Sequence, residues 1–288
     1  MAALASRARP RLHPPLPRGA AVAFTLPAPA PPRLASRPRG IVSAESMGTV
    51  VKLSKNQHWA SFMYGRERQL LVHVVNNSKE GDSQSVLDAM DSFWGHHFGM
   101  AQTGTWSVRG DILDNSVREK GAKRALELGT YCGYSALRIA RSLPANGKLA
   151  SVEIDPLFAA IATKIIEHAG LDHKVKVVTG TVEEKLDRIT EVFFHPSEPK
   201  EAVDFVLCDH DKERFVPDLE LLETGNLAGP GTVIMTDTTT YPGEDKPEES
   251  ENLLEYFVSS SKYRVQQHVG TDRGKAAGIT VSEWQHMV

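Results

Sequence analysis

Two spacings of apolar residues follow one another along this chain. Between residues 59 and 98, apolar side chains recur every three or four positions, with a break at Gly81-Asp82-Ser83, which predicts two helices. From residue 111 onward, short apolar runs typical of buried strands are separated by helical patterns. The expected strands are 124–128, 149–154, 175–178, 203–208, 232–235, 263–269 and 279–284.

The segments between these strands have helical patterns. Helices are expected at 112–121, after Ser135, at 159–169, at 182–193, around 219–223 and after Pro247. Asp155-Pro156 is typical of a helix start, with a capping acid and a first-turn proline. We expect loops at 94–106, which mixes glycines with aromatics, and at 195–202, which is polar.

Strands that alternate with helices form parallel sheets through right-handed crossovers. The pattern therefore predicts an α/β fold with a mostly parallel seven-stranded sheet and helices on both faces. The last two apolar runs, 263–269 and 279–284, follow one another without a helical pattern between them. They predict a final strand pair that is antiparallel.

A turn with two glycines joins the expected strand at 124–128 to the next helix. Gly129 allows a sharp turn with positive φ, and Gly133 allows a ligand to approach the backbone closely. The free N–H groups and positive dipole end of the helix start suit an anionic ligand. The G-x-x-x-G spacing differs from the dinucleotide pattern G-x-G-x-x-G, which disfavours NAD. From these glycines alone, a purely structural turn is equally well supported.

Acidic residues end three of the expected strands. Glu153 ends the second, where an acid can accept hydrogen bonds from both hydroxyls of a ribose; a surface acid beside a helix cap is the alternative. Asp209 and Asp237 end the fourth and fifth, so both would emerge on one edge if these strands are neighbours. Oxygen ligands of this kind suit Mg²⁺, although each aspartate by itself also fits a helix cap.

Two further candidates have ordinary explanations. Lys212 lies three residues past Asp209 and could act as a general base if its pKa were lowered, but most surface lysines are solvated. His96 and His97 are adjacent, so their side chains project in different directions. This favours a solvated pair over a metal site.

Composition narrows the function classes. The 288 residues carry a formal net charge of −3, which gives no basic footprint for nucleic acid. Apolar residues make up 41% of the chain, enough for a core, but no window reaches about 18 uninterrupted apolar residues, so no membrane span is expected. Cys132 and Cys208 are interpreted as reduced core thiols in a reducing compartment rather than as a disulfide.

Residues 1–44 differ from everything that follows them. They contain seven arginines and many prolines but no acidic residue, which fits a disordered tail and an organelle transit segment equally well. Met47 could also be the translation start. We therefore expect a disordered or transit-like segment at 1–46 and one domain at 47–288. The expected compartment is the cytoplasm, or an organelle if 1–46 act as a transit peptide.

Several sequence blocks together resemble the catechol O-methyltransferase family. The resemblance covers about residues 60–285, and the blocks at 128–135 and 208–215 separate this family from the broad methyltransferase class. The blocks are 81–91 (GDSQSVLDAMD), 128–135 (LGTYCGYS), 152–155 (VEID), 208–215 (CDHDKERF), and 236–237 (TD) with 242–243 (PG).

The resemblance implies a Rossmann-like S-adenosylmethionine fold and a Mg²⁺ site that chelates both catechol oxygens. The cofactor contacts that it implies are Gly129, Tyr131 and Ser135 around the methionine part and Glu153 at the ribose, together with Glu127, Ile154, Asp209 and His210. The implied metal ligands are Asp209, Asp237 and Thr238, with Lys212 as the base. The implied substrate contacts are Met100, Lys212, Pro242 and Asp272.

The reaction implied by the resemblance is a direct methyl transfer to a phenolic oxygen. Mg²⁺ bound to both oxygens lowers the pKa of one hydroxyl, and Lys212, if neutral, removes its proton. Most of the catalysis then comes from the placement of the two reactants. The expected partner is a small-molecule catechol, with no nucleic acid and no membrane span, and a monomer is favoured.

Departures from the family pattern bear on the substrate. Thr238 stands in place of an asparagine, so water could fill that metal position. Asp211 stands in place of an aromatic residue, and an extra acid could change metal affinity or favour a cationic substrate. The carboxylate expected at the second hydroxyl falls near Asp272, in a register that the sequence leaves open. Between residues 100 and 110 the chain is a few residues longer, which could reshape the substrate mouth.

Two alternatives therefore stay open. The first is an O-methyltransferase that acts on another vicinal diphenol, of the caffeoyl or flavonoid type. The second is a protein that keeps the methyltransferase fold and binds ligands but has lost turnover.

Overall fold

The computed structural model describes residues 57–98, 105–195, 197, 199–237, 247–272 and 275–285. The chain divides into two units, Met1–Lys52 and Leu53–Val288, and every described residue belongs to the second. The expected segment at 1–46 and its boundary therefore lie outside the described residues.

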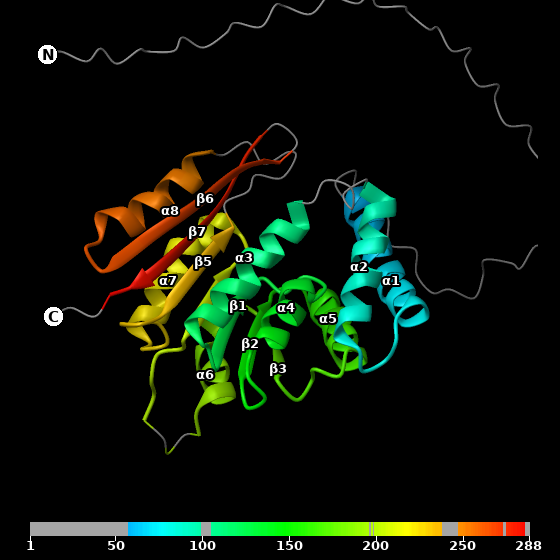
Figure 1. Cartoon of the computed structure of the whole chain (residues 1–288), viewed down its shortest axis with the longest axis horizontal. Coiled ribbons are helices and arrows are strands. Elements are labelled where there is room, and N and C mark those ends of the chain that lie inside the picture. Colours follow the sequence, from blue (N-terminus) through cyan, green and yellow to red (C-terminus); the bar gives the residue numbers. More distant parts are fainter. Residues whose placement is uncertain are drawn as a thin grey trace, which may run out of the picture. The chain divides into compact units, whose positions relative to one another are not determined.

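Seven strands form one sheet in the order β3-β2-β1-β4-β5-β7-β6 (Figure 1). Strands β1 to β5 pair in parallel, whereas β7 runs antiparallel to both of its neighbours, β5 and β6. The bounds are β1 Arg124–Leu128, β2 Lys148–Glu153, β3 Val175–Thr179, β4 Phe205–Cys208, β5 Val233–Asp237, β6 Tyr263–Asp272 and β7 Lys275–Trp284. The predicted sheet, with its antiparallel final pair, is confirmed.

Helices precede, connect and flank the strands. They are α1 Gln57–Asn77, α2 Ser83–Phe98, α3 Thr105–Lys120, α4 Tyr134–Ser142, α5 Pro156–His168, α6 Val182–Phe193, α7 Phe215–Thr224 and α8 Pro247–Ser259. A short 3₁₀ turn, Lys212–Arg214, leads into α7.

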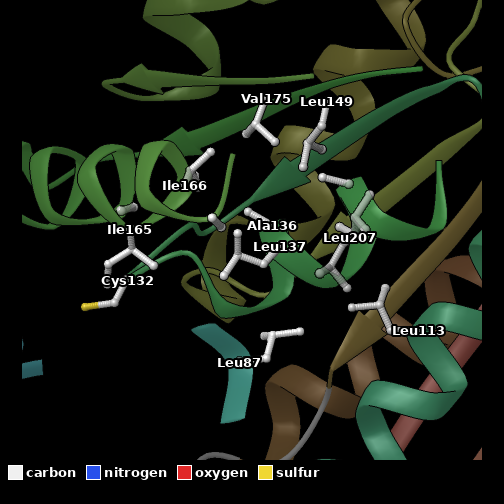
Figure 2. Packing of buried hydrophobic residues seen from close by; sticks show 14 of the residues in the cluster. Leu87, Leu113, Cys132, Ala136, Leu137, Leu149, Ile165, Ile166, Val175 and Leu207 are labelled. Carbon is white, nitrogen blue, oxygen red and sulfur yellow. The ribbon is translucent and has the colours of Figure 1, made fainter. Parts of the chain in front are cut away.

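Two apolar clusters, one on each face of the sheet, form the core. Successive strand residues point to opposite faces, so Ala125 of β1 belongs to the first cluster and Leu126 to the second. Side chains of α1 to α5 fill the first cluster, and side chains of α6, α7 and α8 fill the second. Figure 2 shows part of the first, where Leu137 of α4 lies among side chains from the sheet and from other helices. Helices therefore cover both faces, as expected.

Helices α1 and α2 form an outer pair on the first face. They pack against each other, α1 also packs on α5, and α2 packs on α4 (Figure 1). Their connection is anchored to the end of α5, because the Gly81 N–H donates to the His168 carbonyl at 2.8 Å. The Ser78 hydroxyl also lies 3.1 Å from His168 Nε2.

The loop expected at 94–106 is wrong at 94–98 and 105–106, where the structure describes it, whereas the helical pattern expected up to residue 98 is confirmed. Helix α2 continues through Phe98 and α3 begins at Thr105, so 99–104 is the part that lies outside the described residues. Both helices pack on the first cluster, Trp94 and Phe93 from the end of α2 and Leu113 and Val117 from α3. Burial of such faces stabilises helices whose own periodicity is weak.

Local signals at helix ends are confirmed. Asp155 caps α5, and its Oδ1 accepts hydrogen bonds from the N–H groups of Leu157 at 2.7 Å and Phe158 at 3.2 Å. Helix α3 ends before Gly121, whose φ is +64°, and α5 ends near Gly170, whose φ is +72°. Both values lie in the left-handed region that favours glycine after a helix.

Within the described ranges, no helix is both long enough and apolar enough to cross a membrane. Cys132 and Cys208 are free and buried. The expectation of unpaired core thiols is confirmed, and burial raises the pKa of both thiols above its ordinary value.

Candidate active site

The carboxyl ends of four parallel strands meet at one edge of the sheet. Leu128 of β1 pairs with Val152 of β2 and with Cys208 of β4, and Cys208 pairs with Thr236 of β5. Strands β4 and β5 are therefore neighbours, as the proposed metal pair requires. Ligands of α/β sheets bind at this edge. The segments that emerge here are the glycine loop, residues 129–133, with Glu153, Asp209 and Asp237.

Gly129 is required by a close approach of two backbones. Its φ is +97°, and a Cβ at this position would lie 2.3 Å from the carbonyl oxygen of Asp209. The Asp209 N–H in turn donates to the Leu128 carbonyl at 2.9 Å. Glycine at 129 therefore brings the loop against the end of β4, where the candidate metal ligand lies.

Glycine is favoured at position 133 for a different reason from the one expected. Its φ of +88° favours glycine, but a Cβ there would face α5, with Ala162 Cβ at 3.4 Å. The prediction that Gly133 leaves space for a ligand is therefore replaced by a backbone explanation. Gly133 also provides no side-chain cap for α4.

Glu153 fixes the glycine loop. One of its oxygens accepts a hydrogen bond from the Tyr131 N–H at 2.6 Å, and the other accepts from the Asp155 N–H at 2.9 Å. The side chain is buried, and burial raises the pKa of the carboxyl group despite these backbone hydrogen bonds. The alternative of a solvated surface acid is excluded. Its neighbour Ile154 is 70% exposed at the same edge.

Glu127 is fully buried below the loop. Its Oε1 accepts a short hydrogen bond from the Ser135 hydroxyl, and its Oε2 accepts one from the Ser151 hydroxyl at 2.5 Å. Thr130 Oγ1 lies 2.5 Å from the Ser151 hydroxyl. Burial raises the pKa of Glu127 to about 7. The structure thus brings the predicted Glu127 and Ser135 together and adds Ser151 and Thr130, which the sequence analysis did not identify.

The buried acid Asp218 holds His210. The Nε2 atom of His210 lies 3.0 Å from Asp218 Oδ2, and the Arg214 guanidinium donates to the other oxygen of Asp218 at 2.9 Å. Asp218 is buried, and the His210 ring packs against Phe215 with centroids 4.9 Å apart. His210 Nδ1 is buried and has no hydrogen-bond partner among the described residues. No local spacing in the sequence indicated Asp218.

Asp211 and Lys212 begin the 3₁₀ turn that follows β4. Asp211 caps this turn, because its Oδ1 accepts a hydrogen bond from the Glu213 N–H at 3.2 Å. The unexpected acid at 211 therefore has a local structural role. Lys212 is half-buried and directly follows it.

The candidate metal ligands fit an oxygen-binding cation only in part. Asp209 and Asp237 follow paired positions of β4 and β5, where the strands lie ~4.8 Å apart. Within the described ranges, no three His, Cys, Asp or Glu side chains gather as a metal cluster. Thr238 lies outside the described residues, as does the side chain of Asp237. The backbones of two aspartates therefore lie at the ends of neighbouring strands, and aspartate is a residue type that suits Mg²⁺.

The predicted substrate contacts are mostly untested. Met100 and Pro242 lie outside the described residues. Asp272 ends β6 opposite Lys275 of β7, and β7 passes Asp237 at Ile279, so the hairpin extends beyond the carboxyl edge. His96 and His97 lie in the last turn of α2, but their side chains are not described.

Comparison with known proteins shows which family this chain resembles in sequence and in structure. Residues 76–266 match the family model described as O-methyltransferase. Catechol O-methyltransferase of Bos taurus is 36% identical over 69% of this chain and 68% of its own length. Catechol O-methyltransferase B of Danio rerio is 38% identical over 69% of this chain and 70% of its own length.

The chain belongs to the catechol O-methyltransferase family. Among solved structures, the O-methyltransferase from Bacillus cereus in complex with SAH has a TM-score of 0.53 and 26% identity, over 62% of this chain and 81% of its own. As a member of this family, the protein is an S-adenosylmethionine-dependent methyltransferase with a Rossmann-like fold.

Proposed function

We propose that this protein transfers a methyl group from S-adenosylmethionine to a hydroxyl of a catechol, with Mg²⁺ and Lys212 as its catalytic aids. The observation that carries the proposal is that Asp209 and Asp237 follow paired positions of β4 and β5, with the Asp209 backbone against the glycine loop. The relatives named as catechol O-methyltransferases supply the substrate class.

The glycine loop and α4 would hold the methionine part of the cofactor. No side chain caps α4, and the positive dipole end of this helix would suit the cofactor carboxylate. Glu153 would receive the ribose hydroxyls, because its oxygens are fixed by backbone N–H groups and a carboxylate oxygen can accept more than one hydrogen bond. The exposed Ile154 would provide apolar contact beside it.

Asp209 and Asp237 would hold Mg²⁺, with Thr238 or water as a further ligand. The bound ion would lower the pKa of a coordinated catechol hydroxyl. Lys212 emerges directly after this edge, on the 3₁₀ turn that Asp211 caps, and would accept the hydroxyl proton. The loop and the strand ends would then hold the two reactants for a direct displacement.

The test uses the full chain with S-adenosylmethionine and a panel of catechols, with Mg²⁺ and again with a chelator. We expect methylated product only with Mg²⁺. In Lys212→Ala, turnover should fall at least about 100-fold, because the general base is lost, while cofactor affinity stays unchanged. Lys164→Ala, on the exposed side of α5, is the control and should keep native turnover.

Two outcomes would contradict parts of the proposal. A near-native rate for Lys212→Ala would remove the base assignment. Cofactor binding without product from any catechol would instead favour another vicinal diphenol or a protein without turnover.

A further inference from the structure

A cavity lies at the amino edge of the sheet, where the parallel strands begin, opposite the candidate active site. The starts of β2 and β3 and the second half of α6 form it, and its volume is about 310 Å³. Lys148 begins β2, whereas Glu153 ends the same strand about 16 Å away, at the carboxyl edge. This amino-edge cavity is therefore separate from the glycine loop. Its volume lies at the lower end of the range for small-molecule sites.

Most of the charge around the amino-edge cavity is positive. Its charged lining residues are Lys148, Asp172, Lys174, Lys176, Arg188 and Glu191. Four cations against two carboxylates leave an excess of two positive charges, with His173 neutral. The chain as a whole carries −3. Like charges around one cavity repel each other, and an anion that enters the cavity relieves this repulsion.

Local structure accounts for two of the four cations. The Lys174 ammonium donates to the carbonyls of Ala140 and Leu143 at the end of α4, at 3.1 and 2.9 Å. Lysine commonly binds the last carbonyls of a helix in this way. Arg188 pairs with Glu191 on the same helix at 2.7 Å. Its guanidinium carries five N–H groups, so further donors remain for a ligand.

The other two cations are not neutralised. The Lys148 ammonium donates to the His173 carbonyl at 2.7 Å, which uses one of its three N–H groups. The Lys176 ammonium has no ion-pair or hydrogen-bond partner among the described residues. Ala150, two positions past Lys148 on β2, pairs with Lys176 of β3 and belongs to the second cluster. Both lysines therefore emerge on the face of the sheet that α6 covers.

Strand β3 lies at the edge of the sheet, which offers another explanation for Lys176. Charged side chains on an edge strand keep other chains from pairing with it. This explanation covers Lys176 alone, because Lys148 lies on β2, inside the sheet, and Arg188 lies on α6. Cations from three separate elements around one cavity suit a bound anion better than edge protection.

We propose that the amino-edge cavity binds a small molecule that carries phosphate groups with at least two negative charges, held by Lys148, Lys176 and Arg188. Two charges match the excess on the lining, and a phosphate group brings nearly two charges in one compact group. Ammonium and guanidinium groups are the usual partners of phosphate oxygens. The site lies apart from the methyl-transfer residues, so the inference does not rest on the proposed function.

The probe is inorganic pyrophosphate, added to the full chain without Mg²⁺ and with saturating S-adenosylhomocysteine to fill the cofactor site. Affinity is measured by calorimetry at constant ionic strength, because salt screens exposed charges. Lys148→Gln and Lys176→Gln should each weaken pyrophosphate binding about fivefold, the size of one exposed charge contact. Lys176→Arg keeps the charge and should bind as the native chain does.

Glu191→Gln gives a sharper test, because its expected effect has the opposite sign. The variant removes a carboxylate from the lining and releases Arg188, so pyrophosphate should bind about fivefold more tightly. Lys79→Gln is the matched control and should bind as the native chain does. Lys79 is an exposed lysine in the α1–α2 connection, and the described residues provide no acidic partner for it.

The substituted side chains Lys148, Lys176 and Glu191 are exposed, so the variants should fold. A native chain that binds no pyrophosphate would overturn the proposal, as would equal affinities in the native chain and the glutamine variants. Light scattering tests the edge-strand explanation: self-association of Lys176→Gln with native pyrophosphate affinity would overturn the proposal. Binding of a polyglutamate peptide but not of pyrophosphate would assign the cavity to an acidic protein segment and would also overturn it.

Discussion

The buried carboxyl group of Glu127 makes the stability of the fold depend on pH. Its folded pKa is about 7, against an ordinary value of 4.5, because burial disfavours the charged form. Between these two values the folded chain keeps a proton that the unfolded chain has lost. Stability from this group is therefore fully present below about pH 4.5, falls as pH rises, and is lost above about pH 7.

Glu127→Gln should remove this pH dependence. The amide keeps the shape and can still hydrogen-bond both serine hydroxyls, but it does not ionise. Relative to the native chain, the variant should gain up to about 3 kcal/mol of unfolding free energy between pH 4.5 and pH 8. Urea unfolding of the cofactor-free protein at both pH values measures this, with Glu80→Gln as an exposed control. A difference that does not change with pH would contradict the assignment.

Gly129→Ala should damage both the fold and the site. The new Cβ would meet the Asp209 carbonyl, and the φ of +97° is strained for alanine. We expect a loss of about 3 kcal/mol or more in stability, with loss of S-adenosylhomocysteine binding.

Gly121→Ala is the matched comparison for Gly129→Ala. Its φ is +64°, but a Cβ there has nothing within 4 Å, so it should cost only the strain of about 1–2 kcal/mol. Thermal unfolding separates the two effects. Equal losses would show that the clash with Asp209 does not matter.

For individual residues, sequence analysis identified candidates at the ends of strands. It missed residues whose partners are distant in the sequence. Gly129, Glu153 and Asp209 were found because a strand followed by a glycine or an acid marks the ligand edge of a parallel sheet. Glu67, which accepts a hydrogen bond from the Tyr131 hydroxyl, and Asp218, which holds His210, were missed. Each meets its partner through the packing of helices, which no local spacing encodes.

Asp218 joins two elements, α7 and the turn after β4. Asp218→Leu should leave His210 and Arg214 without their shared partner and should cost about 2–4 kcal/mol. Asp218→Asn, which keeps an oxygen acceptor, should cost less. Urea unfolding tests this, with the exposed Glu220→Gln as the control. An equal cost for the leucine and asparagine variants would show that only the volume of the side chain matters.

At the scale of helices and strands, the positions of the buried strands could be predicted from the sequence. The strands from β1 to β5 are short apolar runs bounded by glycine, proline or acids, and their observed bounds lie close to those expected. The helical pattern up to residue 98 matches the end of α2, although the loop expected at 94–106 overlapped it. The start of α3 at Thr105 was not predicted, because glycines and aromatics there obscure the helical period.

At the scale of the whole molecule, the outer helix pair should respond to cofactor binding. The Tyr131 hydroxyl of the glycine loop donates to Glu67 of α1 at 2.5 Å, so bound S-adenosylhomocysteine should slow amide hydrogen exchange around residue 67 as well as in the loop. Helix α8 packs in the second cluster, on the other face of the sheet, and serves as the internal control. Protection confined to the loop and α4 would contradict the link.

The position of β7 between β5 and β6 has a consequence for how the chain is made. During synthesis, β5 and β6 emerge from the ribosome before the strand that separates them. The hydrogen-bonding edge of β5 therefore stays open until residues 275–284 appear, and β6 has no partner until then. A ribosome-stalled chain that ends before residue 275 should expose that open edge and depend on chaperones to avoid aggregation.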